Sequence, residues 1–104
     1  MTWIHHCDLS GAQGLYHSDG NSNCIQAYEL QQGVIEYCYM HDAVAGVFEK
    51  STPYYNVVRH CFIDNVYHPW LSNLNGGSGT CFFHDNIAVA LDVAESYFQF
   101  FGIS

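Results

Sequence analysis

The chain has 104 residues, of which 49% are hydrophobic and 16% aromatic, so it is expected to form one domain around a single core rather than a disordered chain. Ten acidic residues accompany only two basic ones, Lys50 and Arg59, which gives a formal charge of −8 at pH 7. This balance argues against binding DNA, RNA or an anionic membrane through lysine and arginine contacts. It favours a basic protein partner, a cation, or solubility alone.

The N-terminal residues and the cysteines bear on location. The chain shows neither the basic and apolar regions of a secretory signal nor an apolar run long enough to span a membrane, so we expect a cytoplasmic protein. The cysteines are odd in number and irregularly spaced, which does not fit a disulfide framework. We expect free thiols, most of them buried, at Cys7, Cys24, Cys38, Cys61 and Cys81.

The first half of the chain contains strand patterns separated by a polar loop. Short strands are predicted at residues 3–5 and 15–17, followed by the loop Ser18-Asp19-Gly20-Asn21-Ser22-Asn23. Residues 24–30 have the pattern of a strand, and residues 34–40 are predicted as the returning strand because they are rich in β-branched and aromatic side chains. With the short turn between them they predict a β-hairpin.

The second half continues with strands. Residues 54–63 predict a long strand, Asp64-Asn65 suits a turn, and residues 66–68 lead back until Pro69 ends the strand or marks a sheet edge. Residues 80–83 predict a last short strand.

The C-terminal segment has a helical spacing of apolar residues. Asp85 is predicted to cap a helix over residues 86–101, with Gly102 at its C-terminal end. One apolar stripe runs along it, formed by Ile87, Leu91, Ala94, Phe98 and Phe101. The predicted fold is a single α+β domain over residues 1–104, with an antiparallel sheet of four to six strands and the C-terminal α-helix packed on one face. Ile87, Leu91, Ala94 and Phe98 should be buried, and Glu29 and Glu36 should point to solvent.

A repeated segment occurs forty-three residues apart. Cys38-Tyr39-Met40-His41-Asp42-Ala43-Val44-Ala45 returns as Cys81-Phe82-Phe83-His84-Asp85-Asn86-Ile87-Ala88. We interpret each copy as a strand that ends at His, followed by Asp as a helix N-cap, with the cysteines as buried thiols and no cofactor.

The same repeat contains two Cys-x-x-His pairs, which together form a possible tetrahedral zinc set. A small structural zinc-binding module that uses Cys38, His41, Cys81 and His84 is therefore the alternative. Against it, a Cys and a His three residues apart on a strand project to opposite faces. A thiol-dependent enzyme is the second alternative, since Cys, His and Asp could form a nucleophilic triad. The acidic charge would raise thiol pKa values, and no oxyanion motif is present, so we predict no enzymatic activity.

The aromatic content points to a recognition surface. A core of this size cannot easily bury two Trp, eight Tyr and seven Phe, so some should lie exposed beside carboxylates. The alternative is that the tyrosines lie at strand edges and have no role in binding. The candidate partner-binding residues are Glu29, Glu36, Tyr54, Tyr55, Asp64, Tyr67 and Trp70. Exposed strand edges or an aromatic patch could also form a homodimer.

The closing unit allows a comparison with a known class of proteins. Gly79-Thr80-Cys81-Phe82-Phe83-His84-Asp85 leads into the predicted helix, and with the small size and acidity it resembles the small phage-encoded inhibitors of bacterial defence, of the anti-CRISPR and anti-restriction type. The resemblance implies a non-enzymatic, DNA-mimicking inhibitor that would act in the host cell cytoplasm. Such a protein would cover a basic nucleic-acid-binding surface of a defence complex without contacting nucleic acid or membrane itself. No functional residue can be carried over, because the class has no diagnostic motif.

Overall fold

The computed structural model describes residues 1–11, 22–28, 32–50, 55–73, 80–90 and 99–101. This part of the chain consists of β-strands whose pairings are all parallel, and it contains no helix. The strands are β1 (Thr2–His5), β2 (Asp8–Ser10), β3 (Asn23–Tyr28), β4 (Gln32–Glu36), β5 (Tyr39–Lys50), β6 (Tyr55–Arg59), β7 (Phe62–Asn73), β8 (Thr80–His84), β9 (Ile87–Ala90) and β10 (Gln99–Phe101). Among these residues no helix is long or apolar enough to cross a membrane.

The predicted α+β fold with an antiparallel sheet and a C-terminal helix is wrong. Asn86 follows a sharp bend, and residues 87–90 and 99–101 are strands that pair with β7. Ile87, expected to be buried, is 65% exposed, whereas Leu91, Ala94 and Phe98 lie outside the described residues. The helical spacing was misleading because pairing along β7 decides the conformation of residues 87–90, and tertiary pairing overrides local periodicity.

The predicted hairpin and the predicted strand end are wrong as well. β3 pairs with β5, whereas β4 lies in the other sheet between β1 and β6. Pro69 lies inside β7, which runs from Phe62 to Asn73. It lies opposite Gly46, where a Cβ atom would be only 2.8 Å from the Pro69 carbonyl oxygen. Gly46 therefore leaves space for the Pro69 carbonyl oxygen, and the strand continues past the proline.

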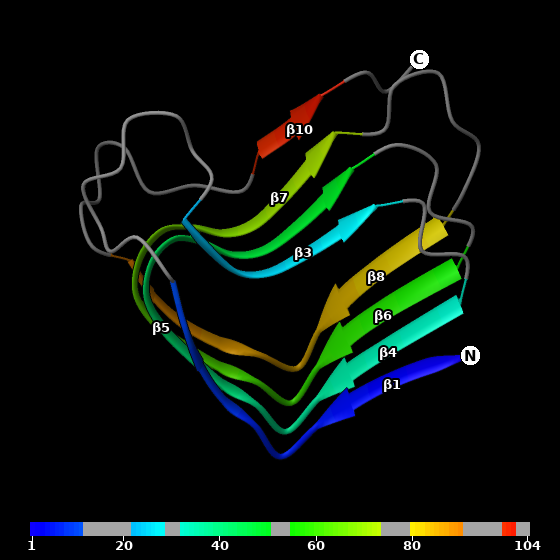
Figure 1. The fold of residues 1–104 in the computed structure, drawn as a ribbon, viewed down its shortest axis with the longest axis horizontal. Coiled ribbons are helices and arrows are strands. Elements are labelled where there is room, and N and C mark those ends of the chain that lie inside the picture. The colour runs from blue at the N-terminus through cyan, green and yellow to red at the C-terminus, as the bar shows by residue number, and fades with distance from the viewer. Residues whose placement is uncertain (12–21, 29–31, 51–54, 74–79, 91–98, 102–104) are drawn as a thin grey trace.

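The topology is that of a parallel β-helix, in which each turn of the chain pairs with the turn before it. One sheet has the strand order β1-β4-β6-β8, and the other runs β10-β7-β5-β2 with β3 on β5 and β9 on β7. Ile4, Ile35, Val58 and Phe83 occupy successive positions in the first sheet, so the repeat lengths are 31, 23 and 25 residues. In Figure 1 β1, β4, β6 and β8 form one layer, and β3, β7 and β10 lie in the layer opposite.

A sharp bend follows each strand of the first sheet, and the bends lie in line (Figure 1). At each bend one non-glycine residue has a left-handed backbone, with φ of 52–53°, at His6, Tyr37, His60 and Asp85. We call these four residues the corner ridge. Bulky residues adopt positive φ rarely, so the stacked turns on either side must hold them there.

The residue after each bend points into the interior and forms a column of Cys7, Cys38, Cys61 and Asn86. The turns are linked here by regular backbone bonds, since the amides of Tyr39, Phe62 and Ile87 donate to the carbonyls of Cys7, Cys38 and Cys61 at 2.8–2.9 Å. Asn86 replaces cysteine in the fourth turn. Its side chain accepts from the Cys61 amide at 2.8 Å and donates to the Val58 carbonyl at 3.0 Å.

The hydrophobic core consists of such columns, in which like residues lie above one another. Ile35, Met40, Val58 and Ile63, from the second and third turns, are almost wholly buried. Cys38 and Cys61 belong to the same core and are free thiols. Cys38 is thus buried as expected, but it lies in a bend rather than on a strand.

Candidate functional site

Three of the four residues of the corner ridge, His6, Tyr37 and His60, form a stack of aromatic rings on the outside of the molecule. The ring centroids of His6 and Tyr37 are 5.3 Å apart and those of Tyr37 and His60 are 5.1 Å apart, with interplanar angles of 19° and 9°. His84 meets His60 edge-on at 6.4 Å. Because the rings cover one another's faces, the ridge presents ring edges and the Tyr37 hydroxyl to solvent.

One side of the ridge combines exposed apolar residues with carboxylates. We call it the acidic flank, and it comprises the outward-facing residues of β2, β5, β7 and β9, namely Asp8, Tyr39, His41, Asp42, Phe62, Asp64, Ile87 and Val89. Its apolar column starts with Tyr39, 37% exposed, and continues with Phe62, 41% exposed, and Ile87. The rings of Tyr39 and Phe62 are stacked at 5.5 Å, and His41 stacks on Tyr39 at 4.4 Å.

His41 is held between two carboxylates of this flank. Its Nδ1 is 2.6 Å from Asp42 Oδ2 and its Nε2 is 2.6 Å from Asp8 Oδ1. Asn65 supports the arrangement, because its side-chain amide donates to Asp42 Oδ1 at 2.6 Å. The hydrogen bonds to Asp42 and Asp8 raise the pKa of His41, and the hydrogen bond to His41 lowers the pKa of Asp42. With both ring nitrogens hydrogen-bonded to carboxylates, the protonated form of His41 is favoured and neither nitrogen is open to a substrate.

The described residues of the acidic flank carry a net negative charge even when His41 is protonated. Asp8, Asp42 and Asp64 lie around a single imidazolium, so the described carboxylates outnumber the positive charge. The pKa of the neighbouring Tyr39 is raised, first by desolvation and then by the negative charges of Asp64, Asp42 and Asp8. The flank is therefore an apolar strip bordered by negative charge.

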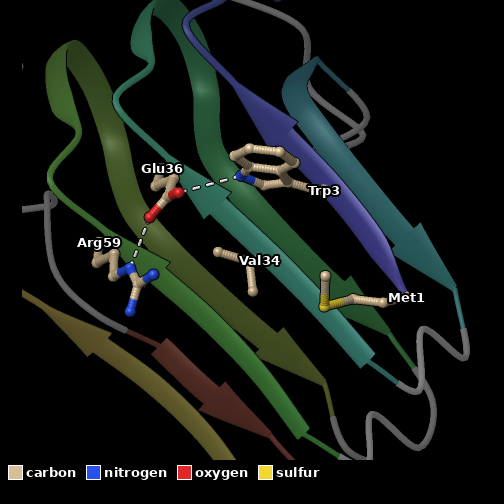
Figure 2. Close-up of a pocket in the computed structure, with 5 residues that line it drawn as sticks. All are labelled: Met1, Trp3, Val34, Glu36 and Arg59. Atoms are coloured by element: carbon tan, nitrogen blue, oxygen red, sulfur yellow. Dashed lines mark hydrogen bonds and ion pairs between the residues drawn. The ribbon is translucent and has the colours of Figure 1, made fainter.

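The other side of the ridge is the outer face of β1, β4, β6 and β8. Here Glu36 accepts hydrogen bonds from Trp3 Nε1 at 3.1 Å and from Arg59 Nε at 2.7 Å. The hydrogen bond from Arg59 is the main cause of a lowered pKa of Glu36. Figure 2 shows Glu36 between the side chains of Trp3 and Arg59. Met1 and Val34 complete a shallow hollow of about 200 Å³.

The cysteine column does not resemble a nucleophilic site. Burial raises the pKa of Cys61 to about 11 and also raises that of Cys38. The pKa of Cys24 is raised to about 11, again mainly by burial. The thiols of Cys38 and Cys61 donate to backbone carbonyls of Glu36 and Arg59 at 3.3 Å. These three thiols are therefore protonated near neutral pH, whereas a catalytic cysteine needs a lowered pKa.

The predicted partner-binding residues that the structure describes lie on different parts of the molecule. Glu29 and Tyr54 lie outside the described residues. Asp64 belongs to the acidic flank, Tyr55 lies exposed on the other side of the ridge, and Tyr67 is half-buried. Trp70 is buried and donates to Glu49 Oε2 at 3.3 Å. Glu36 was expected to point to solvent but is only 9% exposed, because Trp3 and Arg59 lie against it.

For the zinc alternative, the structure places Cys38 and His41 of the first Cys-x-x-His pair apart. Cys38 points into the core, whereas His41 lies on the outer side of β5. Cys81 lies in β8 and pairs with Asn56, and the ring of His84 contacts Asp85 at 2.7 Å. Among the residues described here, no three His, Cys, Asp or Glu side chains are placed to hold a metal ion.

The proposed helix caps are also wrong. Asp42 lies inside β5 and Asp85 at the bend between β8 and β9; both have positive φ, and no helix begins at either residue. Asp and Asn adopt this conformation more readily than most residues, and Asn65 of β7, which is hydrogen-bonded to Asp42, has positive φ as well.

Most of the acidic flank was missed from the sequence. A pattern that could have found it recurs in Ile4-His5-His6-Cys7, Ile35-Glu36-Tyr37-Cys38 and Val58-Arg59-His60-Cys61. In each copy an inward aliphatic residue, an outward polar residue and a bend precede an inward cysteine. The residue after that cysteine is then outward, which places Asp8, Tyr39 and Phe62 in one exposed column.

Comparison of the chain with protein-family models, with curated proteins and with solved structures found no match.

Proposed function

We propose that this protein is a non-enzymatic binding module whose acidic flank contacts a basic protein. The observation that carries the proposal is the close placement of exposed apolar and acidic side chains in two neighbouring outward columns. The exposed apolar side chains of Tyr39, Phe62 and Ile87 lie directly beside the carboxylates of Asp8 and Asp64. Aromatic residues bordered by charge are typical of protein interfaces, in which apolar contacts give affinity and the charged rim gives steering and register.

The ring geometry favours a protein over a glycan or a nucleic acid. Sugars and bases bind aromatic side chains through exposed ring faces, as in single-strand binding proteins. On this surface Tyr37 and Tyr39 each stack against two neighbouring rings, and Phe62 stacks against Tyr39, at centroid distances of 4.4–5.5 Å. The edges and hydroxyl groups that remain are suited to the side chains and backbone carbonyls of a protein partner.

The charge distribution indicates a basic partner. Arg59 is neutralised by Glu36, whereas the described carboxylates of the acidic flank share only His41. A lysine- or arginine-rich surface would be attracted to this flank, and such surfaces are typical of proteins that handle nucleic acids. Covering one would block its substrate, so an inhibitor of a bacterial defence complex is the specific form of the proposal. Its support is the small size and the charge of −8.

The test compares two variants of equal net charge. Asp64→Asn removes a carboxylate from the acidic flank with little change in shape, and Gln32→Lys adds a charge on the exposed outer side of β4. Each changes the formal charge from −8 to −7. Each immobilised protein is exposed to a bacterial lysate, and bound proteins are eluted by increasing salt and identified by mass spectrometry.

The proposal expects a basic protein that elutes at raised ionic strength, is retained by Gln32→Lys and is weakened by Asp64→Asn. Loss of the partner's nucleic-acid binding in a mobility-shift assay would support inhibition. Equal weakening by both variants would show that net charge alone is responsible and would refute the role of the acidic flank. Binding that does not respond to salt would refute the basic partner.

A further inference from the structure

The two ends of the β-helix differ from its inner turns. In the second turn Ile35, Cys38 and Met40 are almost fully buried. The residues at the same positions in the first turn, Ile4, Cys7 and Leu9, are only half-buried. In the fourth turn Phe83 and Asn86 are half-buried, and Ala88, which occupies the inward position of Met40, is exposed. The core columns are therefore open at both ends.

The strands at these ends are also open along their outer edges. Within the described residues β1 and β2 pair only with β4 and β5, and β8 and β9 pair only with β6 and β7. All pairings are parallel, so the strands of the fourth turn and those of the first turn run in the same direction. The outer edge of the fourth turn of one copy can therefore pair in parallel with the outer edge of the first turn of another copy. Exposed edges of this kind are templates for pairing with another chain.

We propose that copies of this protein associate head to tail, with β8 and β9 of one copy paired in parallel with β1 and β2 of the next. Continuing the register places Phe82 beside Trp3, Phe83 beside Ile4 and Ala88 beside Leu9 of the following copy. The half-buried core columns of the two ends then join into one continuous core. Small Ala88 against larger Leu9 avoids overpacking at the junction.

The backbone bonds of the bends extend across this junction. Within one copy, the amide two residues after the bend donates to the carbonyl of the preceding turn, as from Ile87 to Cys61. The next bond in the series joins the Asp8 amide of the following copy to the Asn86 carbonyl. Asp85 then lies beside His6 of that copy in the corner ridge, where a carboxylate and an imidazole are complementary.

The association is open-ended rather than a closed dimer. A contact between two different edges repeats with every added copy, whereas a two-fold dimer uses the same edge twice. The charge of −8 on each copy opposes stacking, and salt screens that repulsion. Stacking should therefore strengthen with ionic strength, whereas binding of a basic partner through the acidic flank should weaken.

Cross-linking tests the register directly. Asn86→Cys extends the cysteine column to the last turn, about 14 Å from Cys7 of the same copy at strand spacing but adjacent to Cys7 of the next. At high salt, oxidised glutathione takes two electrons from the two thiols, which lose their protons to form the disulfide, and is itself reduced to two glutathione thiols. We expect a ladder of dimers, trimers and larger species on a non-reducing gel. Asn86→Ser should stop at dimers at most, and Asn86→Cys combined with Cys7→Ser should lack the ladder.

A second measurement avoids new cysteines. Asp8→Pro removes the amide that would bond the next copy, and Asp8→Ala removes the same carboxylate but keeps that amide. By light scattering at high salt, the average mass of wild type and of Asp8→Ala should rise with concentration beyond twice the monomer mass of 11.8 kDa. The average mass of Asp8→Pro should not rise in this way. Circular dichroism confirms that both variants fold. A wild-type mass that stays at monomer or stops at dimer, a ladder independent of Cys7, or Asp8→Pro assembling like Asp8→Ala would overturn the proposal.

Discussion

The stacked core makes the cost of a truncation depend on the turn in which it lies. Leu9, Met40, Ile63 and Ala88 form one inward column. Ile63 is wholly buried with a neighbour above and below, so Ile63→Ala removes about three buried methylene equivalents, or about 2.4 kcal/mol. The cavity adds about 1–2 kcal/mol, for a total of about 3.5–4.5 kcal/mol. Leu9 is half-buried at the end of the column, so Leu9→Ala should cost about half as much.

Urea unfolding followed by circular dichroism measures both costs. Dilute protein at low salt keeps end-to-end association weakest, so that Leu9 is compared in the single copy. The slope of free energy against urea should match wild type, which confirms that only stability has changed. Equal costs for the two truncations, or a cost below about 1 kcal/mol for Ile63→Ala, would refute the column arrangement, because a buried residue enclosed on both sides must lose more than a half-buried one.

Three further predictions concern packing, pH and thiols. Gly46→Ala should destabilise the fold by about 1–3 kcal/mol in the same urea assay, because the new Cβ atom would meet the Pro69 carbonyl oxygen at 2.8 Å. The folded pKa of His41 is raised above its ordinary value of 6.5, so its stabilisation is complete below that pH and is lost as pH rises through the folded pKa. Wild type should therefore lose stability relative to His41→Gln across that range. With pKa values of about 11, Cys24 and Cys61 should react slowly with iodoacetamide at pH 8 and rapidly after unfolding, as mass spectrometry would show.

Local strand content was predictable because it depends on residue type. The strands predicted at residues 3–5, 54–63 and 80–83 correspond to β1, β6 and β8, although a bend at His60 ends β6 earlier than expected. The pairing was not predictable in the same way. A hairpin rule joins neighbouring strands, whereas here partners are 23–31 residues apart in sequence and lie in parallel register.

The bends explain why the true repeat stayed hidden. A turn that needs positive φ is usually marked by glycine or asparagine, but here the positions hold His6, Tyr37, His60 and Asp85. The internal repeat seen in the sequence instead aligned Cys38 with Cys81, because His-Asp follows both cysteines at the same distance. In the fold Cys38 corresponds to Cys61. Unequal turn lengths and the replacement of cysteine by Asn86 removed the regular period that would have revealed a solenoid.

The acidity of the chain has a consequence for its open ends as well as for its partner. A parallel β-helix with two exposed edges should aggregate without limit unless something opposes pairing. With Arg59 bound to Glu36, and three aspartates around His41, little described positive charge is left to reduce the repulsion between copies. The carboxylates that would attract a basic protein therefore also restrain self-association. A basic protein bound to the acidic flank would neutralise part of that charge, so partner binding should favour stacking even at low salt.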